Sequence, residues 1–169
     1  MKTLPWAAAV AAAVLSGCAT SPETLSCMQP NRRVEVEVGG TKAAPPPKKA
    51  GAKPGRPQSV MHKALAQGDA AWDFGGATLK AGGKSDLDKL VKTVNQGTSR
   101  DKRPTKVSSV IITGHAGKYE AADGKTDLDE QRARAVRDYL ASKGLDQKTM
   151  FWQGRDAEDP VAVTRFCED

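Results

Sequence analysis

The sequence RVEVEV, residues 33–38, alternates strictly between charged and apolar side chains. Successive side chains of a β-strand point to opposite faces of the sheet, so a period of two predicts a strand with one buried face. We expect its glutamates to face solvent and its three valines to face a hydrophobic core: Val34, Val36 and Val38. Gly39-Gly40 follows and is typical of a strand end.

Two helices are predicted after this strand. Apolar residues at helical spacing predict the first from about Lys80 to Gln96; two glycines weaken its first turn, which favours a start near Ser85. The second begins at a cap, Thr126 or Asp127, and ends before Gly144, which suits the C′ position.

Short apolar runs predict three more strands: Ala70–Phe74, Val107–Thr113 and Met150–Gln153. Strands and helices then alternate as βαβαβ, with one extra strand at the N-terminus. This order predicts an α/β (α+β) two-layer sandwich with the helices on one face of a sheet.

A segment rich in Gly, Pro, Ala and Lys, residues 39–60, separates the first strand from the rest of the chain. It has little apolar surface to bury, so we expect an extended, solvated linker. The chain has 26 basic and 20 acidic residues, and six of the basic ones fall between positions 42 and 63, where no acidic residue occurs. The remainder is nearly neutral, which argues against a nucleic-acid-binding face on the domain.

The N-terminus predicts export. Residues 1–17 contain Lys2 and then an apolar run, 6–15, that is too short to cross a bilayer but typical of a signal peptide. Leu15-Ser16-Gly17-Cys18 resembles the lipobox of bacterial lipoproteins, which implies lipidation of Cys18 after cleavage. The alternative is ordinary secretion with Cys18 as a free or disulfide-bonded thiol.

Four segments in order carry a more extensive resemblance, over residues 71–162: WDFGGATLK (72–80), ITGHA (112–116), LDEQRA (128–133) and the stretch from Gly144 to Pro160. Together they resemble the peptidoglycan-associating OmpA-like domain of outer-membrane protein A, Pal and MotB. The resemblance implies a mixed sheet, a periplasmic location and, given Ala19 after the lipidated cysteine, anchoring to the outer membrane.

A fifth segment, Cys27 to Val38, resembles the stretch that normally closes this domain, although here it comes first. We therefore predict a circular permutation: a tether at 18–26, then a domain made of 27–38 and 61–169. The N-terminal strand is expected to pair antiparallel with Ala70–Phe74. The alternative is a stray N-terminal strand outside the domain.

The resemblance also implies a disulfide between Cys27 and Cys167, since related domains often carry one here and an exported protein meets an oxidising compartment. Two free thiols are the alternative.

In the resembled family, an aspartate and an arginine grip diaminopimelate of the peptidoglycan stem peptide. Arg132 stands at the arginine position, but Gly117 replaces the aspartate and Lys125 a usual asparagine. The implied site also includes residues beside these positions: Gly114, His115 and Leu128. Loop carboxylates that would substitute for the missing aspartate are Glu120, Asp123 and Asp127.

The alternative to a binding role is that Arg132 is a solvent-facing helical arginine paired with Asp129 or Asp138. The acidic first turn at 127–130 is then a solvated helix start. We find no catalytic motif, no spaced Cys/His cluster for a metal and no cofactor signature, so we expect no enzyme.

The sequence thus predicts a lipid-anchored periplasmic protein of the outer membrane with weak, non-covalent peptidoglycan binding. The alternative is an OmpA-like protein-interaction module of an envelope complex that has lost binding to the wall.

Overall fold

The computed structural model describes residues 29–45, 55–117, 120 and 127–155. Within these ranges no helix has the length and apolar character needed to span a membrane. Cys18, Cys27 and Cys167 lie outside the described residues, so the predicted lipidation and disulfide remain predictions.

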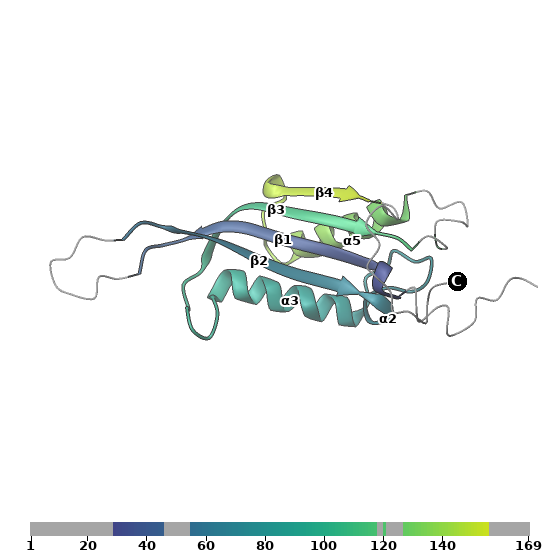
Figure 1. Ribbon diagram of the computed structural model, residues 1–169, viewed down its shortest axis with the longest axis horizontal. Helices are drawn as coiled ribbons and strands as arrows, with labels where there is room; N and C mark the ends of the chain where they lie inside the picture. Colours follow the sequence, from purple (N-terminus) through teal and green to yellow (C-terminus); the bar gives the residue numbers. More distant parts are fainter. Residues whose placement is uncertain (1–28, 46–54, 118–119, 121–126, 156–169) are drawn as a thin grey trace, which may run out of the picture.

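A four-stranded mixed sheet forms one layer of the protein (Figure 1). Its order is β2-β1-β3-β4. The N-terminal strand β1 (Arg33–Lys42) pairs antiparallel with β2 (Gln58–Gln67) on one side and with β3 (Thr105–His115) on the other. The short edge strand β4 (Met150–Gly154) runs parallel to β3.

Two helices, α3 (Ala81–Gln96) and α5 (Leu128–Ser142), form the second layer, and Figure 1 shows both on the same side of the sheet. Three shorter elements complete the described part of the chain: η1 (Gln29–Asn31), α2 (Gly68–Ala71) and η2 (Gln147–Thr149). The architecture is the predicted two-layer α/β sandwich.

The alternation in β1 has the predicted effect. Val34, Val36 and Val38 are 0% exposed, and they pack among the leucines and valines of both helices. Full burial of one such side chain contributes about 1.5–3 kcal/mol relative to exposure. Because β1 lies between β2 and β3, the first strand of the chain holds the middle of the sheet.

The predicted strand at Ala70–Phe74 is wrong. The strand beside β1 is β2, which the sequence analysis missed, and the chain then turns through α2. Trp72 is fully buried and its Nε1 donates to the carbonyl oxygen of Ala66, 3.0 Å away. The aromatic signal therefore marks a residue packed under the end of β2, whereas the strand itself is built largely from small and polar residues.

The predicted linker is also shorter than expected at both ends. β1 continues to Lys42 and β2 begins at Gln58, so two glycines and several polar residues belong to the β-ladder.

Both predicted helices are present, but the expected start of the first near Ser85 is wrong, because α3 begins at Ala81 and includes both glycines. The absence of a side chain at Gly82 allows the helix to approach Ala70, since a Cβ there would lie 2.5 Å from the carbonyl oxygen of Ala70.

Candidate carboxylate-binding site

The predicted site residues meet at the carboxyl end of β3, beside the start of α5 and the turn that follows α2. Arg132 projects from the first turns of α5 and is 0% exposed. The structural interpretation of Arg132 as a solvent-facing arginine paired with Asp129 or Asp138 is therefore wrong.

The guanidinium of Arg132 binds the carboxylate of Glu120 as a bidentate fork. Nη2 lies 2.8 Å from Oε1 and Nη1 lies 3.0 Å from Oε2. The remaining donors reach backbone carbonyls, with Nε donating to Gly76 at 2.9 Å and Nη1 to His115 at 3.3 Å. Every nitrogen of the fork thus has an oxygen partner, which is the arrangement that recognises a carboxylate.

Glu120 is equally buried, at 0% exposure. The backbone N–H groups of Gly117 and Gly75 donate to its two oxygens at 2.9 and 3.0 Å. Burial alone raises the pKa of Glu120, but the hydrogen bonds from Arg132 and from the two glycines outweigh it, so its pKa is lowered. The carboxylate is therefore ionised at neutral pH.

A second buried arginine, Arg32, lies beside this pair. Its side chain is 2% exposed and contacts Asp69, with Nη2 2.5 Å from Oδ1. Its Nε lies 4.0 Å from Oε1 of Glu120 and has no hydrogen-bond partner among the described residues. Each guanidinium also makes a cation–π contact. Arg32 lies 6.0 Å from the ring centre of Phe74, and Arg132 lies 5.6 Å from that of Trp72.

The site therefore holds two buried guanidinium groups around one buried carboxylate. A buried charge is costly unless it is paired, and here each guanidinium has a carboxylate partner, Glu120 for Arg132 and Asp69 for Arg32. The ammonium-binding aspartate of the resembled family has no equivalent at Gly117, whose N–H instead donates to Glu120.

Gly114 and Leu128, two other predicted site residues, pack at the junction of β3 and α5. Gly114 brings β3 against α5, because a Cβ there would lie 1.9 Å from the carbonyl oxygen of Asp129. Leu128 and His115 are 1% and 3% exposed. Asp129 is buried at 4%, so the acidic first turn of α5 is only partly a solvated one.

Sequence reasoning missed Arg32 and did not single out Glu120. Arg32 lies far from Arg132 in the sequence, and only the pairing of β1 with β3 brings the two together. Glu120 was one of three acidic loop residues considered. Asp123 lies outside the described residues, and Asp127 accepts a hydrogen bond from the side chain of Gln131 on the helix surface.

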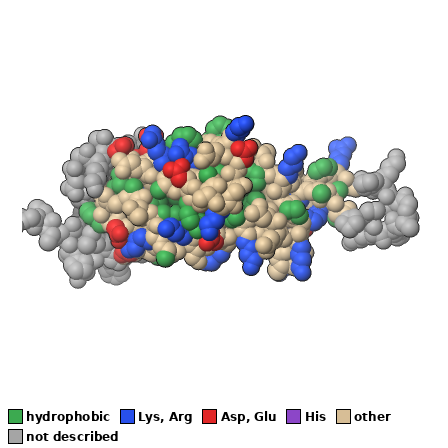
Figure 2. Space-filling model, turned by 180° about the vertical axis from the view of Figure 1, so that it is seen from behind, with side chains coloured by type: hydrophobic (Ala, Val, Ile, Leu, Met, Phe, Trp, Pro, Cys, Tyr) green, Lys and Arg blue, Asp and Glu red, His purple; other side chains and the backbone are tan. Residues whose placement is uncertain are grey.

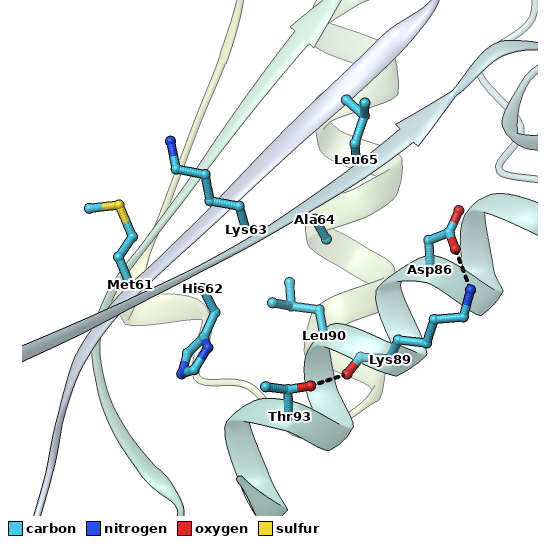
Figure 3. A pocket seen from close by; sticks show the side chains of 9 residues that line it. All are labelled: Met61, His62, Lys63, Ala64, Leu65, Asp86, Lys89, Leu90 and Thr93. Atoms are coloured by element: carbon cyan, nitrogen blue, oxygen red, sulfur yellow. Dashed lines mark hydrogen bonds and ion pairs between the residues drawn. The ribbon is translucent and has the colours of Figure 1, made fainter. Parts of the chain in front are cut away.

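An open groove of about 560 Å³ runs between β2 and α3 (Figure 3). His62 and Ala64 point from β2 toward Leu90, whereas Met61, Lys63 and Leu65 point to the opposite side of the sheet. Its helix-side charges, Asp86 and Lys89, pair with each other at 2.8 Å. The groove thus lacks the convergent, buried polar groups found around Arg132. No cluster that would hold a metal ion occurs in the described part of the chain.

Fold and site together define a small α/β domain in which a buried arginine holds a carboxylate of the same chain. The model of the OmpA family matches residues 71–168, and the protein therefore belongs to the OmpA family. The match begins after β1 and β2, which reach the sheet from the preceding part of the chain.

Similar proteins include outer membrane protein A of Bordetella avium, 26% identical over 113 residues, which are 67% of this chain and 54% of that protein. Outer membrane protein A of Serratia marcescens is 31% identical over 93 residues, 55% of this chain and 24% of that protein. The chain thus spans about half or less of these relatives. The OmpA-like domain of FopA1 from Francisella tularensis is 26% identical, with a TM-score of 0.42, over 59% of this chain and 61% of that structure.

Proposed function

We propose that the protein is a lipoprotein of the outer membrane, lipidated at Cys18, whose periplasmic OmpA-like domain binds peptidoglycan weakly through Arg132. The relatives are outer-membrane proteins by name, which supports an envelope location. The lipobox-like Leu15-Ser16-Gly17-Cys18 supports the lipid anchor.

The observation that carries the proposal is the bidentate pairing of Arg132. The fork already holds a carboxylate, so its geometry is that of a carboxylate receptor. A stem-peptide carboxylate enters only by displacing Glu120, which is part of the same molecule. Wall binding is therefore weak, because the ligand gains only the difference between its own interactions and those of Glu120.

A second candidate function is an OmpA-like interaction module that does not bind the wall. One observation favours it: Arg132 is 0% exposed and all of its donors are satisfied within the protein. In that case Glu120 is a permanent structural partner and the arginine is never presented to a ligand.

Sedimentation with purified sacculi separates the two functions. Glu120→Gln removes the charge that competes for Arg132 and keeps the side-chain shape, so the bound fraction should rise several-fold; Arg132→Lys loses the fork and should lower it. Glu130→Gln is the matched control. It alters an exposed ion pair on α5, the helix that carries Arg132, and should not change the bound fraction. Circular dichroism verifies folding of each variant.

If neither the natural protein nor Glu120→Gln binds sacculi, peptidoglycan binding is excluded and the interaction module is the remaining function. Binding that ignores both Glu120 and Arg132 would place any wall contact elsewhere on the protein. A diaminopimelate-containing muropeptide should compete with sacculi in the first function only.

We further propose that the domain is circularly permuted, with residues 27–38 taking the place of the family's last strand. The central position of β1, antiparallel to both β2 and β3, supports this order. A disulfide between Cys27 and Cys167 would then join the two ends that the permutation separated.

A further inference from the structure

One end of the elongated molecule is strongly basic. β1 and β2 continue past α3 at this end (Figure 1), and the loop 97–104 lies against them. We define the basic end by its exposed cations in the described ranges: Arg56, Arg100, Lys102 and Lys106. Figure 2 shows blue side chains gathered at this end, with few red ones beside them.

These four cations form no ion pair with a described residue. Elsewhere on the described surface, several cations are paired: Lys63 with Glu37, Lys80 with Asp73, Lys89 with Asp86, Arg134 with Glu130 and Lys143 with Asp88. Lys84, Lys92 and Lys148 are exposed there without an ion pair to a described residue, but they are not gathered with other unpaired cations at one end. Four unpaired cations gathered at one end favour a polyanionic partner at that end.

Asp101 is the single acidic side chain among the described residues of this end, and it already has cationic partners. Arg103 binds it at 2.8 Å and the buried Lys42 binds it at 3.2 Å. The hydrogen bonds from Arg103 hold the pKa of Asp101 well below its usual range, despite an opposing effect of burial, and Lys42 adds to the lowering. Asp101 therefore does not neutralise the exposed cations.

Internal contacts also hold the basic end in shape. Arg103 donates to the carbonyl oxygen of Ala43 and to the side chain of Gln58, which ties the loop to the ends of both β1 and β2. The cations thus project from two strands and a loop that are fixed to one another. A fixed arrangement lowers the entropic cost of binding a partner.

We propose that the basic end is a second contact with the cell wall, in which the four cations bind carboxylates of the peptidoglycan peptides. This rests on the proposed envelope location but not on Arg132. The basic end and the Arg132 site lie at opposite ends of β3, about 30 Å apart at about 3.3 Å per residue. Two weak contacts on one polymer reinforce each other, because the first raises the local concentration of the second.

The position of the basic end favours the wall over the membrane. β1 starts at Arg33, next to the segment that leads to Cys18, and runs away from it toward the basic end. The exposed described residues at this end include no aromatic side chain that would enter a lipid interface or stack on a nucleic-acid base.

The test is sedimentation with sacculi of a triple variant, Arg56→Gln, Arg100→Gln and Lys102→Gln. Its matched control removes three exposed, unpaired cations from elsewhere: Lys84→Gln, Lys92→Gln and Lys148→Gln. We expect the first variant to lose about threefold or more in affinity and the control to keep it. The loss should vanish as salt rises from about 0.01 M to about 1 M, where the screening length falls to about 3 Å.

Equal behaviour of the two triple variants would overturn the proposal. So would loss of binding by the first variant to vesicles of anionic phospholipid with unchanged binding to sacculi, since the partner would then be the membrane. Both triple variants are repeated with Arg132→Lys: a basic-end effect that persists there supports the second contact even if the Arg132 site proves inactive.

Discussion

Arg132 and Glu120 form a bidentate ion pair in which both side chains are completely buried, with oxygen–nitrogen distances of 2.8 and 3.0 Å. Glu120 lies three residues beyond the glycine at the family's aspartate position, and its carboxylate is supported by the N–H of Gly117 itself. The acidic residue that contacts the arginine in this chain is therefore Glu120.

This pair predicts a large stability difference between two glutamate substitutions. Glu120→Ala leaves a buried guanidinium without its counterion and should cost about 3–5 kcal/mol of unfolding free energy. Glu130→Ala breaks an exposed i,i+4 pair with Arg134 and should cost under about 1 kcal/mol. Urea unfolding measures both. Similar losses in the two variants would show that the buried pair is not a stabilising unit.

His62 predicts how the stability of the domain depends on pH. Burial, and then the nearby charge of Lys42, lower its pKa, and the ring contacts Thr105 Oγ1 at 2.9 Å. Because the unfolded chain then binds a proton more readily than the folded one, stability is highest above the unfolded pKa of about 6.5 and falls as pH drops below it.

Proton NMR should find His62 titrating below the usual range of a histidine. His62→Gln should flatten the stability profile between about pH 7 and pH 5. An unchanged profile in this variant would contradict the assignment.

Gly114 is predicted to tolerate no side chain. Its Cβ would overlap the backbone of Asp129, so Gly114→Ala should push β3 away from α5 and destabilise the domain by about 1–3 kcal/mol or more. Gly55→Ala is the control, because a Cβ there meets only Ala44 at an ordinary 3.7 Å. Thermal unfolding compares the two. Equal midpoints would mean that the strand and helix are less closely packed than described.

The proposed permutation predicts that the chain order can be reversed. A rearranged protein that runs from Arg56 to Asp169 and then continues with residues 27–45 should fold, with a similar circular dichroism spectrum. A chain of 56–169 alone exposes the facing edges of β2 and β3 and should not fold cooperatively. If that shorter chain folds as well as the whole, β1 is dispensable and the permutation proposal fails.

The sequence predicted the elements whose periodicity is strong. The valines of β1 and the apolar stripes of α3 and α5 appear where expected, because burial on one face imposes a period that a single sequence displays. β2 escaped detection because its core-facing positions include His62, Ala64 and Ala66, which give a weak apolar alternation, while nearby Trp72 and Phe74 suggested a strand that does not exist.

The site was predictable only in part. Arg132 could be placed from the motif around it, but its burial and its partner depend on where Glu120 lies in three dimensions. The approach of Arg32 depends on strand pairing between distant parts of the chain. Neither relationship has a local sequence signal.

The place of β1 determines how the domain responds to force. A pull transmitted through the N-terminus acts along the axis of β1, which is bonded on both sides over its ten residues. When the opposing hold is at the basic end, such a load shears both ladders at the same time. A hold at the Arg132 site does not, because His115, which Arg132 contacts, pairs with Arg33 at the end of β1 that is pulled. The choice between the two proposed wall contacts therefore decides how the sheet carries tension.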